Sequence, residues 1–179
     1  KFNGLKGQGL LIIKNIQNIE PVVHGGGQEY GLRSGTVNLP MAVSMVKSIK
    51  LTMGRLDEAS RKLNKMNQSV RTFLEEFRGV YINSPKDSAP QIINVSFPGV
   101  KGEVLVNAFS KHGVMISTTS ACSSKRGKLN EVLLAMGVPD ARIEGSIRIS
   151  MGVHTTEEDI QRFKEVFEEV YEEVKELLK

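Results

Sequence analysis

The only cysteine of the chain, Cys122, lies in a run of small polar residues, 117–128. Lys125, Arg126 and Lys128 follow it closely in the sequence. Positive charge near a thiol lowers its pKa and favours the nucleophilic thiolate, and loop residues stay accessible to reactants. The pattern predicts a nucleophilic or sulfur-carrying cysteine. A bystander cysteine, buried as a small apolar residue, is the alternative.

A second candidate site lies in a glycine-rich stretch, where residues 24–29 read HGGGQE and residues 33–36 read RSGT. Consecutive glycines allow positive φ angles and let the backbone approach a ligand closely. Backbone N–H groups, a hydroxyl and the guanidinium of Arg33 together suit an anion. The stretch therefore predicts an anion-binding loop, and the alternative is a flexible loop that contains a turn.

A third candidate is Arg148, within the strand-like segment 146–150, which reads SIRIS. Strand alternation puts Arg148 on the face opposite Ile147 and Ile149. An arginine within an apolar strand is costly unless it is paired, and its planar fork suits a carboxylate through two parallel hydrogen bonds. The segment therefore predicts either a carboxylate-binding arginine or an internal salt bridge. No cluster of residues has metal-ligand spacing.

The elements that hold these residues follow from the apolar pattern. A short apolar run at 10–13, bounded by turn residues, predicts a buried strand. Apolar positions recur with helical spacing from Pro40 to about Phe77, which predicts one long helix with a kink near Gly54. Further strands are predicted at 80–82, 91–97, 114–117 and 146–150, and helices at 103–111 and 130–136. The last helix is predicted to begin with a capping box of Thr155 and Glu158.

This order of elements predicts a fold of the α/β type, with an α+β domain in which helices cover an antiparallel sheet. The change to short alternating elements at Gly79 predicts a domain boundary near residue 78. Residues 79–179 then form a small domain that carries the cysteine loop.

Composition and charge narrow the class of protein. Hydrophobic residues make up 40% and charged residues 25% of the chain, an ordinary globular mixture. No apolar run reaches the roughly 18 residues of a membrane span, no signal peptide is apparent, and a single cysteine fits a reducing cytoplasm. Residues 156–179 hold nine acidic and four basic side chains, whereas residues 1–155 hold 20 basic and 11 acidic side chains and carry a net positive charge. With 6% aromatic residues and no known nucleic-acid motif, we expect no direct nucleic-acid partner.

Together and in this order, the motifs resemble those of the NifS/IscS-like cysteine desulfurases, a class-V aminotransferase group of fold-type-I pyridoxal-phosphate (PLP) enzymes. The matching segments are 1–9, 24–28, 33–36, 120–124 and 146–148. Residues 1–9 resemble the segment that begins at the Schiff-base lysine, with Leu5 where the family usually has proline. The chain is similar to the C-terminal half of such enzymes, which implies that residues 1–38 end the PLP-binding large domain. Residues 39–78 then form the linking helix, and residues 79–179 form the C-terminal small domain.

The resemblance implies a role for each candidate residue. Lys1 holds PLP and moves protons at the substrate Cα, and Thr36 contacts the PLP phosphate, in the site of the partner subunit of a homodimer. Arg148 binds the carboxylate of L-cysteine. Cys122 attacks the substrate sulfur, which leaves L-alanine and a persulfide. The persulfide then passes to a protein acceptor, either an iron–sulfur scaffold or a tRNA-thiolation enzyme.

The resemblance also implies that this chain alone is not a competent enzyme, because the family's residues that stack on the PLP ring and pair with its pyridine nitrogen precede the Schiff-base lysine. Two other functions fit the same residues. One is a selenocysteine lyase or another fold-type-I PLP lyase. The other is a non-catalytic module that docks an acidic partner through the basic loop around Cys122.

Overall fold

The structure is a computed structural model that describes residues 2–118 and 130–178. The chain divides into two compact units, residues 1–57 and 58–179. The boundary between them falls within the segment 39–78, for which a linking role is predicted. The predicted domain roles stay predictions, and each unit is described by itself.

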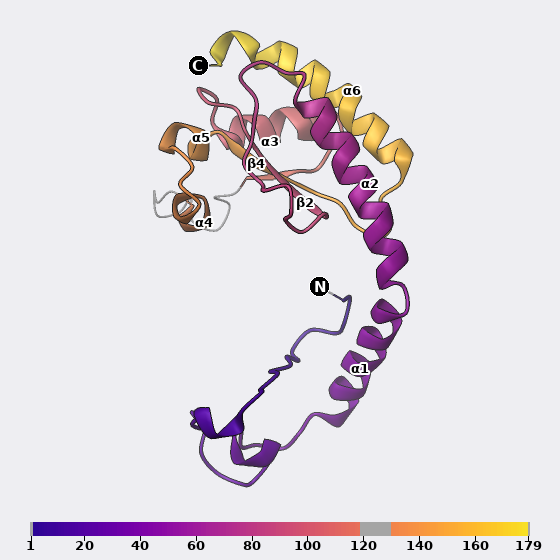
Figure 1. Cartoon of the computed structure of the whole chain (residues 1–179), viewed down its shortest axis with the longest axis vertical. Coiled ribbons are helices and arrows are strands. Elements are labelled where there is room, and N and C mark those ends of the chain that lie inside the picture. Colours follow the sequence, from indigo (N-terminus) through magenta and orange to yellow (C-terminus); the bar gives the residue numbers. More distant parts are fainter. Residues whose placement is uncertain (1, 119–129, 179) are drawn as a thin grey trace. The chain divides into compact units, whose positions relative to one another are not determined.

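Helix α1 (Leu39–Met53) is the main regular element of the first unit (Figure 1). Asn38 caps it, because the Asn38 side-chain oxygen accepts a hydrogen bond from the backbone N–H of Met41 at 3.3 Å. Pro40 lies in the first turn, where its missing N–H costs nothing. Two short 3-10 turns, η1 (Ile16–Asn18) and η2 (Glu29–Gly31), interrupt the irregular chain before it.

The prediction of a buried strand at residues 10–13 is wrong. The structure has no strand there, and the side chains of Leu10, Leu11 and Ile12 are 63%, 73% and 84% exposed. A strand is stable only when it pairs with others and buries a face. The apolar run favours a strand, but a strand also needs a second strand to pair with. Residues 2–57 contain no such strand.

The single helix predicted over residues 40–77 is two helices. Helix α1 ends at Met53, and α2 (Leu56–Leu74) begins after a break at the predicted kink position, Gly54. The N–H of Arg55 bonds to the carbonyl of Thr52 at 3.1 Å, a tightened bond that ends the helical ladder. Glycine weakens a helix interior, which explains a break at this position.

A four-stranded antiparallel sheet forms the centre of the second unit. Its strands are β1 (Tyr81–Ile82), β2 (Ile92–Ser96), β3 (Ser117–Thr118) and β4 (Ser146–Ser150), arranged in the order β1-β2-β4-β3. In the register of β2 with β4, Ile93 lies opposite Ile149 and Val95 opposite Ile147. Cross-strand partners share a face, so these four side chains form one apolar face. The predicted antiparallel sheet is confirmed.

Three helices supply the apolar side chains that bury this face: α2, α3 (Gly102–Lys111) and α6 (Glu157–Val174) (Figure 1). Phe167 of α6 lies at their junction, with its ring centroid 5.5 Å from that of Phe73 and 5.6 Å from that of Phe97. The core cluster includes Met66, Val70, Leu74, Leu105, Phe109, Phe163, Val166 and Val170. The predicted α+β arrangement, with helices covering the sheet, is therefore confirmed.

Two short helices, α4 (Glu131–Ala135) and α5 (Asp140–Glu144), precede β4, and η4 (Lys175–Leu177) follows α6. Helix α5 was not predicted from the sequence, because five residues are too few to show helical periodicity. The arginine of this helix, Arg142, contributes to the site described below. Among the described helices, none combines the length and the apolar character that crossing a membrane requires.

The capping box of α6 lies one residue later than predicted. The Thr156 hydroxyl accepts from the backbone N–H of Asp159 at 3.1 Å, and the Asp159 carboxylate accepts from the backbone N–H of Thr156 at 2.8 Å. The hydroxyl of Thr155 accepts instead from the backbone N–H of Gly152, at 2.9 Å. Both threonines have an acidic residue three positions on, so the sequence pattern does not distinguish them.

Candidate functional site

Arg148 lies on β4, an inner strand between β2 and β3. Its side chain is exposed, whereas Ile147 and Ile149 are buried on the opposite face, as the alternation predicts. The predicted alternative of an internal salt bridge finds no support, because Arg148 has no hydrogen bond or ion pair with any residue in the described part of the chain. None of the described residues uses the donors of this guanidinium, an arrangement that suits a ligand.

Two uncharged residues lie opposite Arg148 on the neighbouring strands. Asn94 of β2 is its register partner on one side and Ser117 of β3 on the other. Directly opposed cross-strand side chains lie about 5 Å apart at Cβ. Arg148 is therefore the charged member of a row that also presents an amide and a hydroxyl.

Asn94 is 6% exposed, and its polar groups are bonded. Its side-chain Nδ2 donates to the carbonyl of Ile147 at 3.0 Å, and its Oδ1 accepts from Nδ2 of Asn83 at 2.6 Å. Its backbone N–H donates to the hydroxyl of Ser84 at 2.8 Å. A buried amide that is satisfied in this way fixes β2 against β4 beside Arg148.

Arg142, from α5, also reaches this polar face. Its Nη2 donates to Oδ1 of Asn83 at 2.8 Å, and its guanidinium carbon lies 4.5 Å from the ring centroid of Tyr81. The Nε of Arg142 is buried and has no hydrogen-bond partner among the described residues. Arg142 is thus held by the protein, in contrast to Arg148.

Sequence reasoning missed Asn83, Asn94 and Arg142. The signal for Asn94 was present in the sequence, because an asparagine between Ile93 and Val95 is unusual within a buried strand. No local signal links Arg142 to Asn83, because 59 positions separate them and only the fold brings them together.

The glycine-rich loop lies in the first unit. The Ser34 hydroxyl donates to the carbonyl of Gly26 at 3.0 Å, and the backbone N–H of Gly35 donates to Oε1 of Gln28 at 3.2 Å. Gly35 has a φ of 123°, in the region that favours glycine. These bonds fold the loop back on itself, so the motifs at 24–29 and 33–36 form one structural feature.

Thr36 follows this loop, and its side chain is exposed. Its hydroxyl has no hydrogen bond within the described residues. The guanidinium of Arg33 donates to the carbonyl of Ser34, so part of its capacity is used within the loop. Thr36 belongs to the first unit and Arg148 to the second, so each is placed only within its own unit.

Lys1 and Cys122 lie outside the described residues. Their predicted roles, like those of Thr36 and Arg148, stay predictions.

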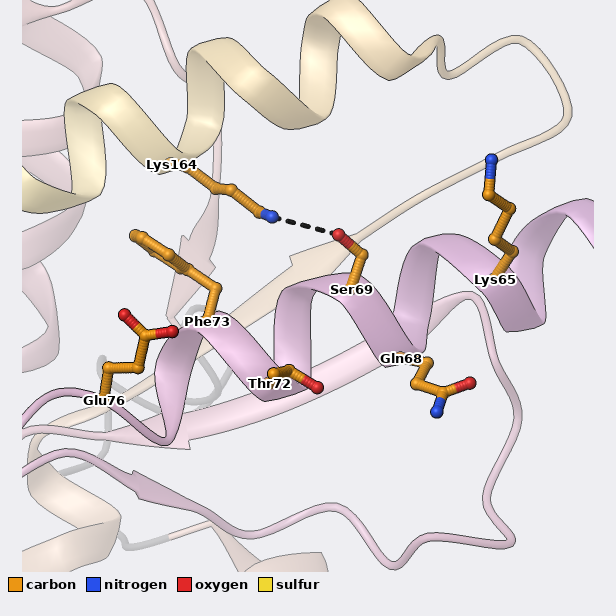
Figure 2. A pocket seen from close by; sticks show the side chains of 7 residues that line it. All are labelled: Lys65, Gln68, Ser69, Thr72, Phe73, Glu76 and Lys164. Carbon is orange, nitrogen blue, oxygen red and sulfur yellow. Dashed lines mark hydrogen bonds between the residues drawn. The ribbon is translucent and has the colours of Figure 1, made fainter.

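A surface pocket of about 410 Å³ lies between α2 and α6 (Figure 2). Lys164 points into it from α6, and its Nζ donates to the hydroxyl of Ser69 at 3.0 Å. Since α2 and α6 bury the apolar face of the sheet, this pocket lies away from Arg148. It contains none of the predicted site residues, and we do not assign it to the candidate site.

Comparison with known proteins supports the resemblance. The chain is 38% identical over 181 residues to cysteine desulfurase IscS of Clostridium botulinum strain Hall, a match that covers 99% of this chain and 46% of that relative. It is 36% identical over 167 residues to cysteine desulfurase IscS of Methanosarcina thermophila, which covers 93% of this chain and 41% of that relative. The chain thus spans about half the length of the curated relatives it matches.

Solved structures agree with the sequence matches. A NifS-like protein superposes with a TM-score of 0.80 and 35% identity, over 96% of this chain and 44% of that one. The NifS-like protein of Rickettsia africae gives a TM-score of 0.71 and 28% identity, over 86% of this chain and 40% of that one. The predicted fold class is therefore confirmed.

The family model described as aminotransferase class-V matches residues 1–163, which include the glycine-rich loop and the whole sheet with Arg148. Its members depend on PLP, which is the cofactor that the resemblance predicted. The match extends over most of the chain, and it joins the two motif-bearing units in the expected order. This chain belongs to the aminotransferase class-V family.

Proposed function

We propose that this chain is part of a PLP-dependent cysteine desulfurase, which converts L-cysteine to L-alanine and holds the released sulfur as a persulfide on Cys122. The relatives named above carry this activity in their names. The single observation that carries the proposal within the structure is the exposed guanidinium of Arg148 on the polar face of the sheet, which has no bonded partner among the described residues. An amino-acid substrate needs a carboxylate partner of this kind.

The glycine-rich loop fits the phosphate of PLP. The Thr36 hydroxyl is exposed and has no partner among the described residues, and the bonds within the loop turn its backbone tightly. A hydroxyl at the end of a glycine-rich turn is a donor suited to an anion. We assign Thr36 to the phosphate, in the site of the second subunit of a homodimer, and Lys1 to covalent attachment of the cofactor. When bound, PLP acts as an electron sink for the bonds at the substrate Cα.

In this proposal, Arg148 binds the substrate carboxylate and so orients the amino acid. Lys1 moves protons at the substrate Cα. The thiolate of Cys122 attacks the substrate sulfur, so that an S–S bond forms and the C–S bond of the substrate breaks. The carbon skeleton takes up a proton and leaves as alanine. Atoms balance, because the thiol gains one sulfur and becomes a persulfide.

The test is mass spectrometry of the intact PLP-loaded protein after brief exposure to L-cysteine. We expect one added sulfur on the peptide that contains Cys122, together with release of alanine. In the matched variant Cys122→Ser, we expect normal PLP content but loss of both alanine release and sulfur transfer, because both depend on the same attack. Sulfur on another residue, or transfer at the wild-type rate by the serine variant, refutes the assignment.

A protein sulfur acceptor, either an iron–sulfur scaffold or a tRNA-thiolation enzyme, completes the proposal, as does a cytoplasmic location. The resemblance supports the acceptor, and the single cysteine fits a reducing compartment. A titration of the persulfide protein with each class of acceptor, followed by the appearance of labelled sulfur on the acceptor, distinguishes them.

A further inference from the structure

Three hydrogen bonds run in one direction across the polar face of the sheet, from α5 to β4. The Arg142 guanidinium donates to Oδ1 of Asn83 at 2.8 Å. The Asn83 amide donates to Oδ1 of Asn94 at 2.6 Å, and the Asn94 amide donates to the carbonyl of Ile147 at 3.0 Å. The last acceptor is the residue before Arg148.

The chemistry of the two ends sets this direction. A guanidinium has only donors and a carbonyl only acceptors, so neither end of the series can reverse. The amide of Asn83 must then present its oxygen to Arg142, and the amide of Asn94 must present its nitrogen to β4. The oxygen of Asn94 therefore accepts a hydrogen bond from Asn83, and the described residues show no hydrogen bond between this oxygen and Arg148.

Within residues 2–118 and 130–178, Arg148 has no hydrogen-bonded or ion-paired partner. Its register partners, Asn94 and Ser117, are both uncharged. Arg142, a second arginine that reaches this face, is held by Asn83 and by the ring of Tyr81. Of these two arginines, Arg142 is used for structure, whereas Arg148 has no bonded partner among the described residues.

We propose that Asn94 is a positioning residue for Arg148. Held by the series of bonds from Arg142, it fixes β4 and keeps an uncharged group opposite the guanidinium, so that the charge of Arg148 is available to the carboxylate of an amino-acid ligand. Ser117, the register partner on the other side of Arg148, is also uncharged. This inference rests on the proposed function, because it takes Arg148 as the carboxylate-binding residue.

The test introduces a carboxylate at the position of the amide. In the intact PLP-loaded protein, Asn94→Asp supplies a negative partner to Arg148 and repels a bound carboxylate. The probes are L-alanine and ethylamine, which differ only in the carboxylate, and their dissociation constants are measured from the change in cofactor absorbance. We expect the preference for L-alanine over ethylamine to fall by about tenfold, with ethylamine binding unchanged.

Asn94→Leu is the matched control. It has nearly the same size and removes the same hydrogen bonds, but it adds no charge. We expect a lower melting temperature, with the preference for L-alanine retained within about threefold. A structural role alone would lower the preference equally in the two variants.

Ser117→Asp provides a second placement of the charge, on an edge strand where a half-buried polar side chain is already accommodated. We expect the same loss of preference for L-alanine. If Asn94→Asp does not give folded protein, the preference for L-alanine measured with Ser117→Asp decides whether the inference holds.

The inference is overturned if the carboxylate variants keep the wild-type preference, or if Asn94→Leu loses as much of it as Asn94→Asp. These measurements need no desulfuration, so a failure of this inference can be told apart from a failure of the proposed function. Failure of the wild type to release alanine from L-cysteine refutes the desulfurase proposal instead.

Discussion

Two arginines on the same face of the sheet have opposite surroundings. Arg142 is half-buried, donates to Asn83 and lies against the ring of Tyr81. Arg148 is exposed on a central strand and has no bonded partner among the described residues. A guanidinium whose donors are used within the protein contributes to stability, and one whose donors are unused suits a ligand.

Arg148→Lys tests the second role at the scale of one residue. Lysine keeps the charge but cannot reproduce the two parallel hydrogen bonds of the guanidinium. In the intact protein we expect KM for L-cysteine to rise by about tenfold, with PLP affinity changed much less. Steady-state kinetics and a cofactor titration measure the two quantities. Unchanged KM and kcat would mean that Arg148 does not bind the substrate.

The position of β4 depends on the residue that precedes it. A Cβ added to Gly145 would lie 2.2 Å from the carbonyl oxygen of Phe97 and 2.7 Å from that of Val100. The carbonyl of Gly145 also accepts from the backbone N–H of Phe97 at 3.0 Å. Gly145 therefore allows the turn after β2 to pack closely against the start of β4, the strand that carries Arg148.

Gly145→Ala should destabilise the protein by about 1–3 kcal/mol, because backbone atoms must move to admit the methyl group. Gly152→Ala is the matched control at the other end of β4, since a Cβ there meets nothing within 4 Å. We expect this second change to be neutral or slightly stabilising. Denaturant unfolding measures both, and equal effects would contradict the role given to Gly145.

At the scale of the whole chain, the two units differ in how much apolar surface they bury. Every member of the core cluster lies between Leu63 and Leu178. Within residues 2–57, Met45 is the one hydrophobic residue that is buried. The first unit leaves many large apolar side chains exposed, including Leu11, Ile12, Val22, Val43, Val46 and Leu51. Exposed apolar surface on this scale is typical of an interface.

We therefore expect residues 56–179, which keep α2 whole, to fold by themselves with one cooperative transition. Residues 2–55 should show no cooperative transition, because the unit lacks a core of its own. Thermal unfolding followed by circular dichroism measures both. A cooperative transition in residues 2–55, or its absence in 56–179, would contradict this division.

Catalytic activity also depends on the length of the chain. We expect the purified 179-residue chain to release no alanine from L-cysteine, because the relatives are about twice as long and the resemblance implies further PLP contacts before Lys1. Sustained alanine release by this chain would refute that expectation.

The sequence by itself determined the resemblance to the family, the alternation that separates Arg148 from Ile147 and Ile149, and the presence of the last helix, α6. These features depend on residue order within short segments, where the periods of strands and helices act directly. Gly54 also indicated where the helical segment is interrupted, because glycine weakens a helix locally.

Only the tertiary structure decided what surrounds Arg148. Asn94 lies 54 positions away in the sequence, and it becomes the neighbour of Arg148 through the register of β2 with β4. Arg142 reaches Asn83 because α5 folds over the same face. The tertiary structure likewise left residues 10–13 without strand partners. Strand pairing and register depend on contacts between distant segments, and no local pattern encodes which segments will meet.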